Sequence, residues 1–139
     1  MKNLKKLIDH LNKDLERELA QIIRYLHHSF IVEGPSRGPL VGLFRQQAQE
    51  SMTHAVKLGE KITALGGHPS IKVQPVPETN EHNVLEILKE SLEFEKNTIK
   101  MYHALLEHVH GNVALEEMVR GLIADEVSHV EEVEKMCRK

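Results

Sequence analysis

Apolar residues recur every three or four positions along four long segments of the chain, which is the spacing of one face of an α-helix. The predicted helices cover residues 3–33, 38–66, 81–110 and 113–137. The segment at residues 68–80 contains three prolines, so we expect an extended connection there. A connection of this length can cross the bundle and lets the second and third helices run parallel. The pattern therefore predicts an all-α four-helix bundle with a long crossover between helices two and three.

Ionisable residues interrupt the apolar face of several predicted helices near their midpoints. The face of the fourth helix is formed by Leu115, Val119, Leu122, Glu126, His129, Val133 and Met136. Glu18 interrupts the first helix in the same way, and Glu95 interrupts the third, whose face begins at Leu85. Burying such groups without a partner or a metal costs several kcal/mol. These positions therefore predict a polar site inside the bundle.

The second helix departs from this arrangement. Its apolar face is formed by Val41, Phe44, Ala48, Ser51, Ala55, Leu58, Ile62 and Leu65, with His54 beside it. At about 100° per residue, Glu50 lies about 40° to one side of His54, and position 51 lies about 60° to the other. Glu50 reaches the centre of the bundle only if the helix rotates or bulges, or if the side chain swings inward.

All the candidate site residues fall close to the middle of their helices and would occupy one layer. They are Glu18, Glu50, His54, Glu95, Glu126 and His129. Four or five carboxylates in one layer would repel one another strongly without a cation. Two divalent metal ions, typically iron, suit this mixture of oxygen and nitrogen donors. The layer therefore predicts a di-metal carboxylate centre. Tyr25 and Tyr102 follow Glu18 and Glu95 on the same faces, where they pack in the core, support a carboxylate or donate an electron near the metals.

Four stretches of the sequence match one known set of motifs. They are residues 11–20 together with Tyr25, residues 52–55, residues 92–95 and residues 125–129. In this combination the chain resembles bacterioferritin-type members of the ferritin-like di-iron superfamily over nearly its whole length. The resemblance implies a ferritin-like four-helix bundle that binds two Fe ions per chain and oxidises Fe(II) to Fe(III) with O2 or hydrogen peroxide, for iron storage or detoxification.

The resemblance also implies a role for each matching residue. Glu18 and His54 would bind one iron, Glu95 and His129 the other, and Glu126 would bridge them. The family pattern in the second helix is Glu-x-x-His, but Ser51 stands three residues before His54. One bridging carboxylate is therefore missing, and Glu50 is the candidate for a displaced second bridge.

Two further features bear on assembly and cofactors. Met52 matches the methionine that binds haem between two subunits in bacterioferritins, and packing is the alternative role for such a methionine. We expect a homo-oligomer, a dimer or larger. Shell-forming relatives carry a short fifth helix after the bundle that has no counterpart before Lys139, so the resemblance leaves the formation of a closed shell open.

Composition and charge narrow the remaining possibilities. With 139 residues, 40% hydrophobic and 28% charged, we expect one soluble, cytoplasmic domain spanning residues 1–139. No apolar run reaches membrane-spanning length, so we expect no membrane partner. A net charge of −3 and 4% aromatic residues disfavour nucleic-acid binding. The single cysteine, Cys137, excludes a disulfide within the chain and a cysteine cage for a metal. We expect most of the other histidines to be solvated: His27, His28, His103, His108 and His110.

Three functions remain open at this point. The first is a ferroxidase that stores or detoxifies iron, and the survival of five of six ligand positions favours it. The second keeps the di-metal centre, with iron or manganese, but removes peroxide without storage. The third is a bundle whose metal site is impaired at Ser51 and which serves as a binding or assembly module.

Overall fold

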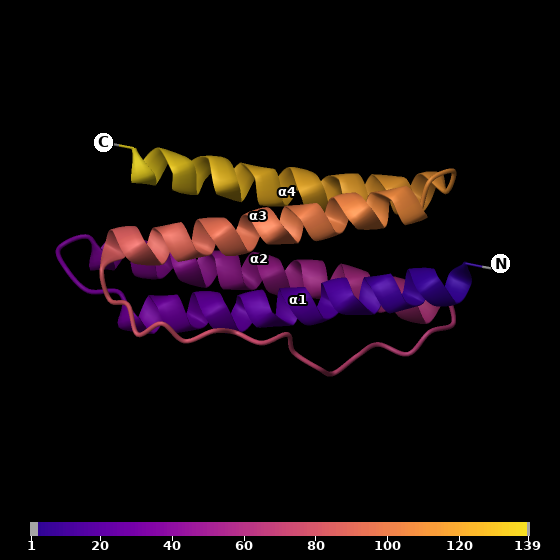
Figure 1. The fold of residues 1–139 in the computed structure, drawn as a ribbon, viewed down its shortest axis with the longest axis horizontal. Coiled ribbons are helices and arrows are strands. Elements are labelled where there is room, and N and C mark those ends of the chain that lie inside the picture. Colours follow the sequence, from indigo (N-terminus) through magenta and orange to yellow (C-terminus); the bar gives the residue numbers. More distant parts are fainter. Residues whose placement is uncertain (1–2, 139) are drawn as a thin grey trace.

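The computed structural model describes residues 3–138, and its regular structure in that range is entirely helical. The four helices are α1 (Leu4–Ile31), α2 (Arg37–Ala64), α3 (Val84–His108) and α4 (Val113–Cys137). Figure 1 shows that α1 and α4 run in one direction and that α2 and α3 run in the other. The connection between α2 and α3 returns along the outside of α1. The predicted all-α bundle with a long crossover is therefore confirmed.

The helix ends follow from local turn and capping chemistry. The Asn83 side chain accepts hydrogen bonds from the backbone N–H groups of Leu85 and Glu86, so α3 begins at Val84 rather than at residue 81. The Asn112 side chain caps α4 in the same way. Gly66 and Gly111 have φ angles of 85° and 89°, where a side chain would be strained. These glycines follow α2 and separate α3 from α4.

Hydrogen bonds to α1 hold the crossover in place. Asn12 donates to the backbone carbonyl of His68 at 3.0 Å and accepts from the backbone N–H of Ser70 at 2.7 Å. Further along, the Gln74 backbone N–H donates to the Glu16 carbonyl at 3.3 Å. These bonds satisfy polar groups of a segment that has no regular structure of its own. The crossover is therefore a strap that is attached to the outer side of α1.

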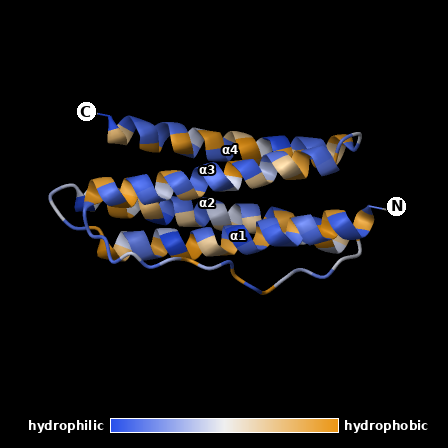
Figure 2. Cartoon of the chain, in the orientation of Figure 1, coloured by the Kyte–Doolittle hydropathy of each residue, from blue (hydrophilic) through white to orange (hydrophobic). Residues whose placement is uncertain are grey.

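Apolar side chains form two clusters, one at each end of the bundle. One cluster joins the start of α1 and α4 to the end of α2 and α3, and it includes Leu11, Leu58 and Leu122. The other joins the opposite ends of the helices and includes Phe44 and Ile87. Figure 2 shows hydrophobic and hydrophilic residues mixed along every helix, and none of the described helices is long and apolar enough to cross a membrane. The polar layer lies between the two clusters.

The buried faces of the helices differ from the predicted faces at a few positions. Leu85 and Met136, which the periodicity assigns to the core faces, are 37% and 41% exposed. His28 is the exception among the five histidines of which we expected most to be solvated, since it is only 2% exposed and its Nδ1 lies 3.1 Å from the Ser91 hydroxyl. It is buried because α1 packs against both α2 and α3 and therefore buries a wider face than its apolar residues alone indicate.

Removing a core side chain tests this packing. Leu58→Ala should lower the free energy of unfolding by about 2–5 kcal/mol, because Leu58 is fully buried and its loss leaves a cavity. Ile71→Ala on the crossover is the control, since Ile71 is exposed and its loss should change stability by less than about 0.5 kcal/mol. Urea denaturation followed by circular dichroism measures both. Equal stability of the two variants would contradict the core described here.

Candidate metal centre

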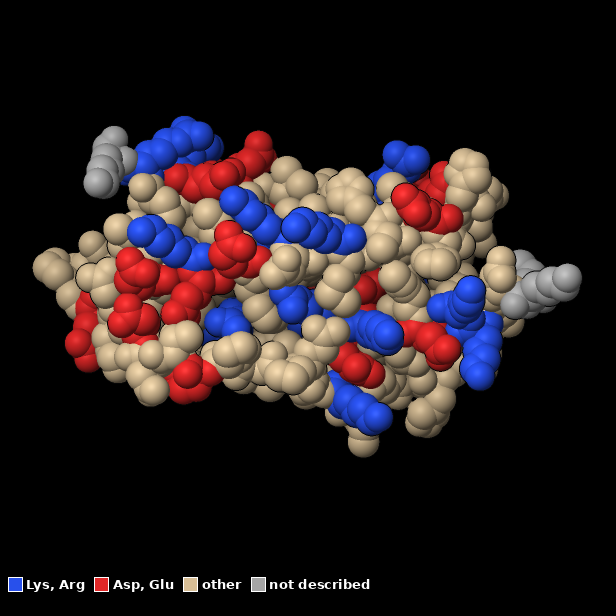
Figure 3. All heavy atoms as spheres, viewed as in Figure 1, with Lys and Arg blue, Asp and Glu red and all other residues tan. Residues whose placement is uncertain are grey.

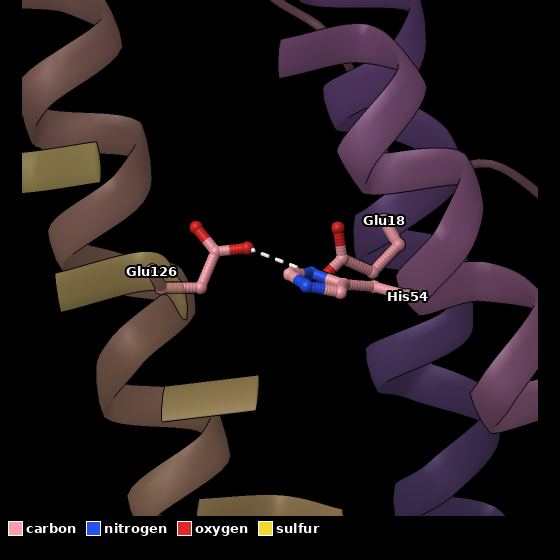
Figure 4. Close-up of side chains that lie close together, drawn as sticks. All are labelled: Glu18, His54 and Glu126. Carbon is pink, nitrogen blue, oxygen red and sulfur yellow. Dashed lines mark hydrogen bonds and ion pairs between the residues drawn. The ribbon is translucent and has the colours of Figure 1, made fainter. Parts of the chain in front are cut away.

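Three side chains from three helices meet in the middle of the bundle. Glu18 comes from α1, His54 from α2 and Glu126 from α4, and all three are buried. Nδ1 of His54 lies 3.3 Å from Oε2 of Glu18 and 3.2 Å from Oε1 of Glu126. Figure 4 shows both carboxylates directed at the His54 ring. Each residue offers one donor atom within 4.8 Å of the others, which is close enough for one metal ion to contact all three.

A second group lies beside the first one. It consists of Glu95 from α3 with Glu126 and His129 from α4, again with donor atoms within 4.8 Å of one another. Nδ1 of His129 is 3.7 Å from Oε2 of Glu95 and 3.9 Å from Oε2 of Glu126. Glu126 therefore offers one oxygen to each group. A carboxylate in this position can bridge two metal ions.

Several atoms of the two groups are buried without a hydrogen-bond partner among the described residues. They are Oε1 of Glu18, Oε2 of Glu95, both carboxylate oxygens of Glu126 and Nδ1 of His129. Burying a charged oxygen without a partner is costly, so such atoms are rare unless a ligand satisfies them. The orphaned donors are the oxygen and nitrogen types that bind divalent iron, manganese or zinc. The residues present therefore fit a pair of metal ions.

Two tyrosines hold the outermost carboxylates of the layer. Tyr25 donates a hydrogen bond to Oε1 of Glu95, and Tyr102 donates one to Oε2 of Glu18. Both tyrosines are buried, and burial, together with the neighbouring carboxylates, keeps the pKa of each well above its usual value. Each phenol therefore remains protonated and donates to one carboxylate oxygen. The other oxygen of each carboxylate stays free for a ligand.

Two carboxylates outside the layer contact the far side of the histidine rings. Oδ2 of Asp125 on α4 lies 2.9 Å from Nε2 of His54 on α2. In return, the Glu50 carboxylate on α2 contacts Nε2 of His129 on α4. Each acid thus stands four residues before the histidine of its own helix and binds the histidine of the other. These contacts fix each ring with Nδ1 turned inward, as outer carboxylates do for metal-binding histidines.

A polar pocket of about 210 Å³ gives access to the layer from the surface between α2 and α4. Its lining includes both histidines and the two outer carboxylates, together with Thr53 and Ser128. Glu50 and Asp125 are partly exposed at its mouth, whereas Glu18, Glu95 and Glu126 lie behind the histidine rings. A cation from solvent therefore meets two carboxylates before it reaches the buried donors.

A chain of hydrogen-bonded side chains begins at Ser51, where the expected carboxylate is missing. The Gln21 amide donates to the Ser51 hydroxyl at 3.3 Å and accepts from Thr98 at 2.6 Å. The guanidinium of Arg17 donates to the Thr98 hydroxyl at 3.0 Å and stacks on the Phe94 ring. We call Arg17, Gln21, Ser51 and Thr98 the serine network. It fills the space beside the layer with hydrogen bonds rather than with negative charge.

The structure thus brings five of the six predicted residues into the two inner groups: Glu18, His54, Glu95, Glu126 and His129. The sixth, Glu50, lies on the outer side of His129, and its role as a metal ligand stays a prediction. Met52 is 48% exposed on α2 and takes no part in this layer. Sequence reasoning missed Asp125, although its position four residues before His129 repeats the spacing of Glu50 and His54.

Sequence reasoning also missed Asp14, a buried carboxyl one helical turn before Glu18. Burial, and then the charge of Glu18, raises the pKa of Asp14 to about 8. Neither of its oxygens makes a hydrogen bond within the described residues. Asp14 is therefore largely protonated at neutral pH and adds little negative charge to the layer.

Protons balance part of the negative charge when no metal is bound. Burial alone would lower the pKa of His54, but contacts with Glu126, Glu18 and Asp125 outweigh it and raise this pKa to about 11. Burial is likewise outweighed at His129, where Glu126 and Glu95 raise the pKa to about 10. Burial and the charge of Glu126 raise the pKa of Glu95 to about 8. Both histidines and much of the Glu95 population are therefore protonated at pH 7.

Charged residues on the outer surface are more evenly distributed. Figure 3 shows Lys and Arg side chains interspersed with Asp and Glu over the face that it presents. No field of a single sign dominates that face.

The fold and the layer together define a class of protein, a four-helix bundle with a buried carboxylate and histidine centre. The chain belongs to the ferritin-like domain family, whose model matches residues 8–139. A ferritin-like di-iron carboxylate protein from Bacillus anthracis shares 32% identity with a TM-score of 0.93, and the match covers 99% of both chains.

Bacterioferritins are also similar to this chain. The bacterioferritin of Rhodobacter capsulatus is 29% identical over 137 residues, which are 96% of this chain and 84% of that protein. Its crystal structure, which has a metal-free dinuclear site and a haem iron, superposes with a TM-score of 0.88. The bacterioferritin of Brucella melitensis is 28% identical over 136 residues, again 96% of this chain and 84% of that protein. The resemblance to bacterioferritin-type proteins is therefore confirmed at the level of the family.

The protonated histidines predict a pH dependence of metal binding. A metal ion needs neutral imidazole and ionised carboxylate, so its binding at pH 7 must release the protons of His54, His129 and Glu95. The apparent affinity should therefore rise with pH between about 6 and 8, by about tenfold per unit for each proton released. Titration with Zn²⁺ in weakly buffered solution, followed with a pH electrode, measures the number of protons released per ion bound. The His129→Asn variant should release fewer protons than the wild type. Zn²⁺ binding without proton release would contradict this charge balance.

Proposed function

We propose that this chain binds two Fe(II) ions in the layer and oxidises them to Fe(III), for storage or for detoxification of iron. The observation that carries the proposal is the shared Glu126, which belongs to both groups of candidate ligands. Membership of the ferritin-like family supports it, as do the similar di-iron carboxylate protein and the bacterioferritins. By analogy with these proteins, the reaction would make the chain a ferroxidase.

Iron is the substrate in this proposal. Two Fe(II) ions each lose one electron, and one O2 accepts both electrons with two protons to give hydrogen peroxide. If hydrogen peroxide is the oxidant, it accepts two electrons and two protons to give two molecules of water. The two electrons must reach one oxidant together, so both ions must be held side by side. A shared carboxylate between two ligand groups provides that arrangement.

The residues of the chain would divide the work between them. Glu126 would lie between the two ions, with Glu18 and His54 on one side and Glu95 and His129 on the other. Tyr25 and Tyr102 would hold the terminal carboxylates in place through their hydrogen bonds. Asp125 and Glu50 would hold Nε2 of the histidines, so that Nδ1 points to the ions. Glu50 could act as a second bridge only by leaving His129 and turning inward.

The setting of the reaction extends the same proposal. We infer a homo-oligomer in the cytoplasm, with Fe(II) and O2 or hydrogen peroxide as its small-molecule partners. The exposed apolar side chains Ile23 and Phe30 on α1 and Met52 and Val56 on α2 support association through these two helices. Met52 could bind haem only where a second chain supplies the other ligand. Haem binding therefore requires that the chain forms a dimer.

The number of Fe(II) ions bound per chain tests the two-metal centre. Anaerobic equilibrium titration with elemental analysis should give two ions per chain for the wild-type protein. The Glu126→Gln variant should bind one Fe(II) ion per chain or none, and the His129→Ala variant should bind at most one. Each change removes a donor from the centre. Glu131→Gln, an exposed change on α4, is the matched control and should keep two ions.

The outcomes of this titration separate the candidate functions. Two ions in Glu126→Gln would contradict the role of the shared carboxylate. One ion or none in the wild-type protein would instead favour a bundle whose centre is impaired, which the neutral surroundings of Ser51 make the second candidate function. Circular dichroism on each variant shows that the helices are intact.

Restoring a carboxylate at position 51 tests the effect of the serine network. Ser51→Glu combined with Gln21→Ala, which makes room for the longer side chain, should strengthen binding of the second ion by about 10- to 100-fold. Ser51→Gln combined with the same Gln21→Ala change supplies similar volume without charge and should not. Without metal, the Ser51→Glu double variant should be less stable than the Ser51→Gln double variant, because it buries another carboxylate. Isothermal titration with Zn²⁺ and thermal denaturation provide the two measurements. Equal affinities in the two double variants would show that charge at this position is unimportant.

A further inference from the structure

Two histidines meet at the end of the bundle, away from the buried layer. His10 lies near the start of α1, and His108 is the last residue of α3. Their ring centroids are 4.9 Å apart, and their ring planes are inclined at 47°. Two other surface histidines contact carboxylates instead, His82 with Glu33 and His110 with Glu116. The contact of His10 is with a second imidazole.

The environment of this pair keeps a ring nitrogen available. Burial lowers the pKa of His10, and the charges of His108 and Lys13 lower it further. His10 is therefore neutral at pH 7 and has a lone pair on one ring nitrogen. His108 is exposed and lines a groove of about 570 Å³ together with His110 and the turn between α3 and α4. His108 is thus open to a cation and to water, and the partly buried His10 lies beside it.

The spacing of the rings matches the geometry of two imidazoles on one metal ion. A Zn–N bond of about 2.0–2.1 Å places a ring centroid about 3.2 Å from the metal. Two rings that are about 90–110° apart around the metal then have centroids about 4.5–5.2 Å apart. The observed 4.9 Å falls inside this interval. We propose that His10 and His108 together bind one divalent transition-metal ion, Zn²⁺ or Cu²⁺, through one ring nitrogen each.

The chemistry of the donors selects this class of ion. Imidazole favours Zn²⁺ and Cu²⁺ over the hard ions Mg²⁺ and Ca²⁺, which prefer oxygen. Water in the adjoining groove completes the coordination. The positive charge of Lys13 opposes the ion, so this site is weaker than the carboxylate layer. A bound ion links the start of α1 to the end of α3 and stabilises that end of the bundle.

A comparison of single variants tests this site. Wild-type protein, His10→Asn and His108→Asn are dialysed against Zn²⁺, and bound zinc is counted by elemental analysis. Each variant should bind one ion fewer per chain than the wild type. His110→Asn is the matched control, because His110 lies in the same turn but pairs with Glu116, and it should keep the wild-type count.

Thermal unfolding gives an independent readout. Zinc at a concentration of about 100 times the dissociation constant of this site multiplies the folded-to-unfolded ratio of the wild-type protein about 100-fold. The melting temperature of the wild type should therefore rise by more than that of either variant. Equal zinc counts and equal shifts in all four proteins would overturn the proposal. Anaerobic Fe(II) binding at the layer should be unchanged in His10→Asn and His108→Asn, so failure here is distinguishable from failure of the proposed ferroxidase centre.

Discussion

The organisation of this bundle depends on one buried carboxylate, Glu126, which offers its two oxygens to two different groups of donors. Glu18 and His54 complete one group, and Glu95 and His129 complete the other. Burying this carboxylate is costly, and its partners among the described residues are His54 at 3.2 Å and His129 at 3.9 Å. Cations on both sides of Glu126 would offset the cost of burying it. The arrangement of the four helices can then be understood as a means of bringing four further donor residues to one carboxylate.

The rest of the structure compensates for the cost of that layer. Apolar clusters lie at both ends of the bundle, so burial of leucine, isoleucine and phenylalanine side chains holds the helices together without help from the middle. Tyr25 and Tyr102 each satisfy one oxygen of a terminal carboxylate and leave the other for a ligand. Protonated His54 and His129 offset part of the negative charge of the layer. The apolar clusters, the tyrosines and the protonated histidines together offset the cost of burying the carboxylates.

Periodicity in the sequence predicted the bundle, the crossover and the layer, because a charged residue at a core position of a helix stands out against its apolar neighbours. Glu18, Glu95 and Glu126 were found in this way. The outer residues could not be found so easily. Asp125 and Glu50 lie beside the apolar faces, where charged residues are common, and only the packing of α2 against α4 shows that each contacts the histidine of the other helix. The burial of His28 could not be found for a similar reason, because contacts with α3 widen the face of α1 that is buried.

The structure also changes the interpretation of Ser51. In the sequence, serine at this position suggests only the loss of a bridging carboxylate. In the bundle, Ser51 belongs to a network in which Gln21 and Thr98 are hydrogen-bonded and Arg17 brings a positive charge toward the layer. Gln21 contacts the Ser51 hydroxyl directly, and Thr98 and Arg17 continue the chain of hydrogen bonds from Gln21. The layer therefore contains three buried carboxylates, Glu18, Glu95 and Glu126, while Glu50 and Asp125 contact the histidines from the outer side.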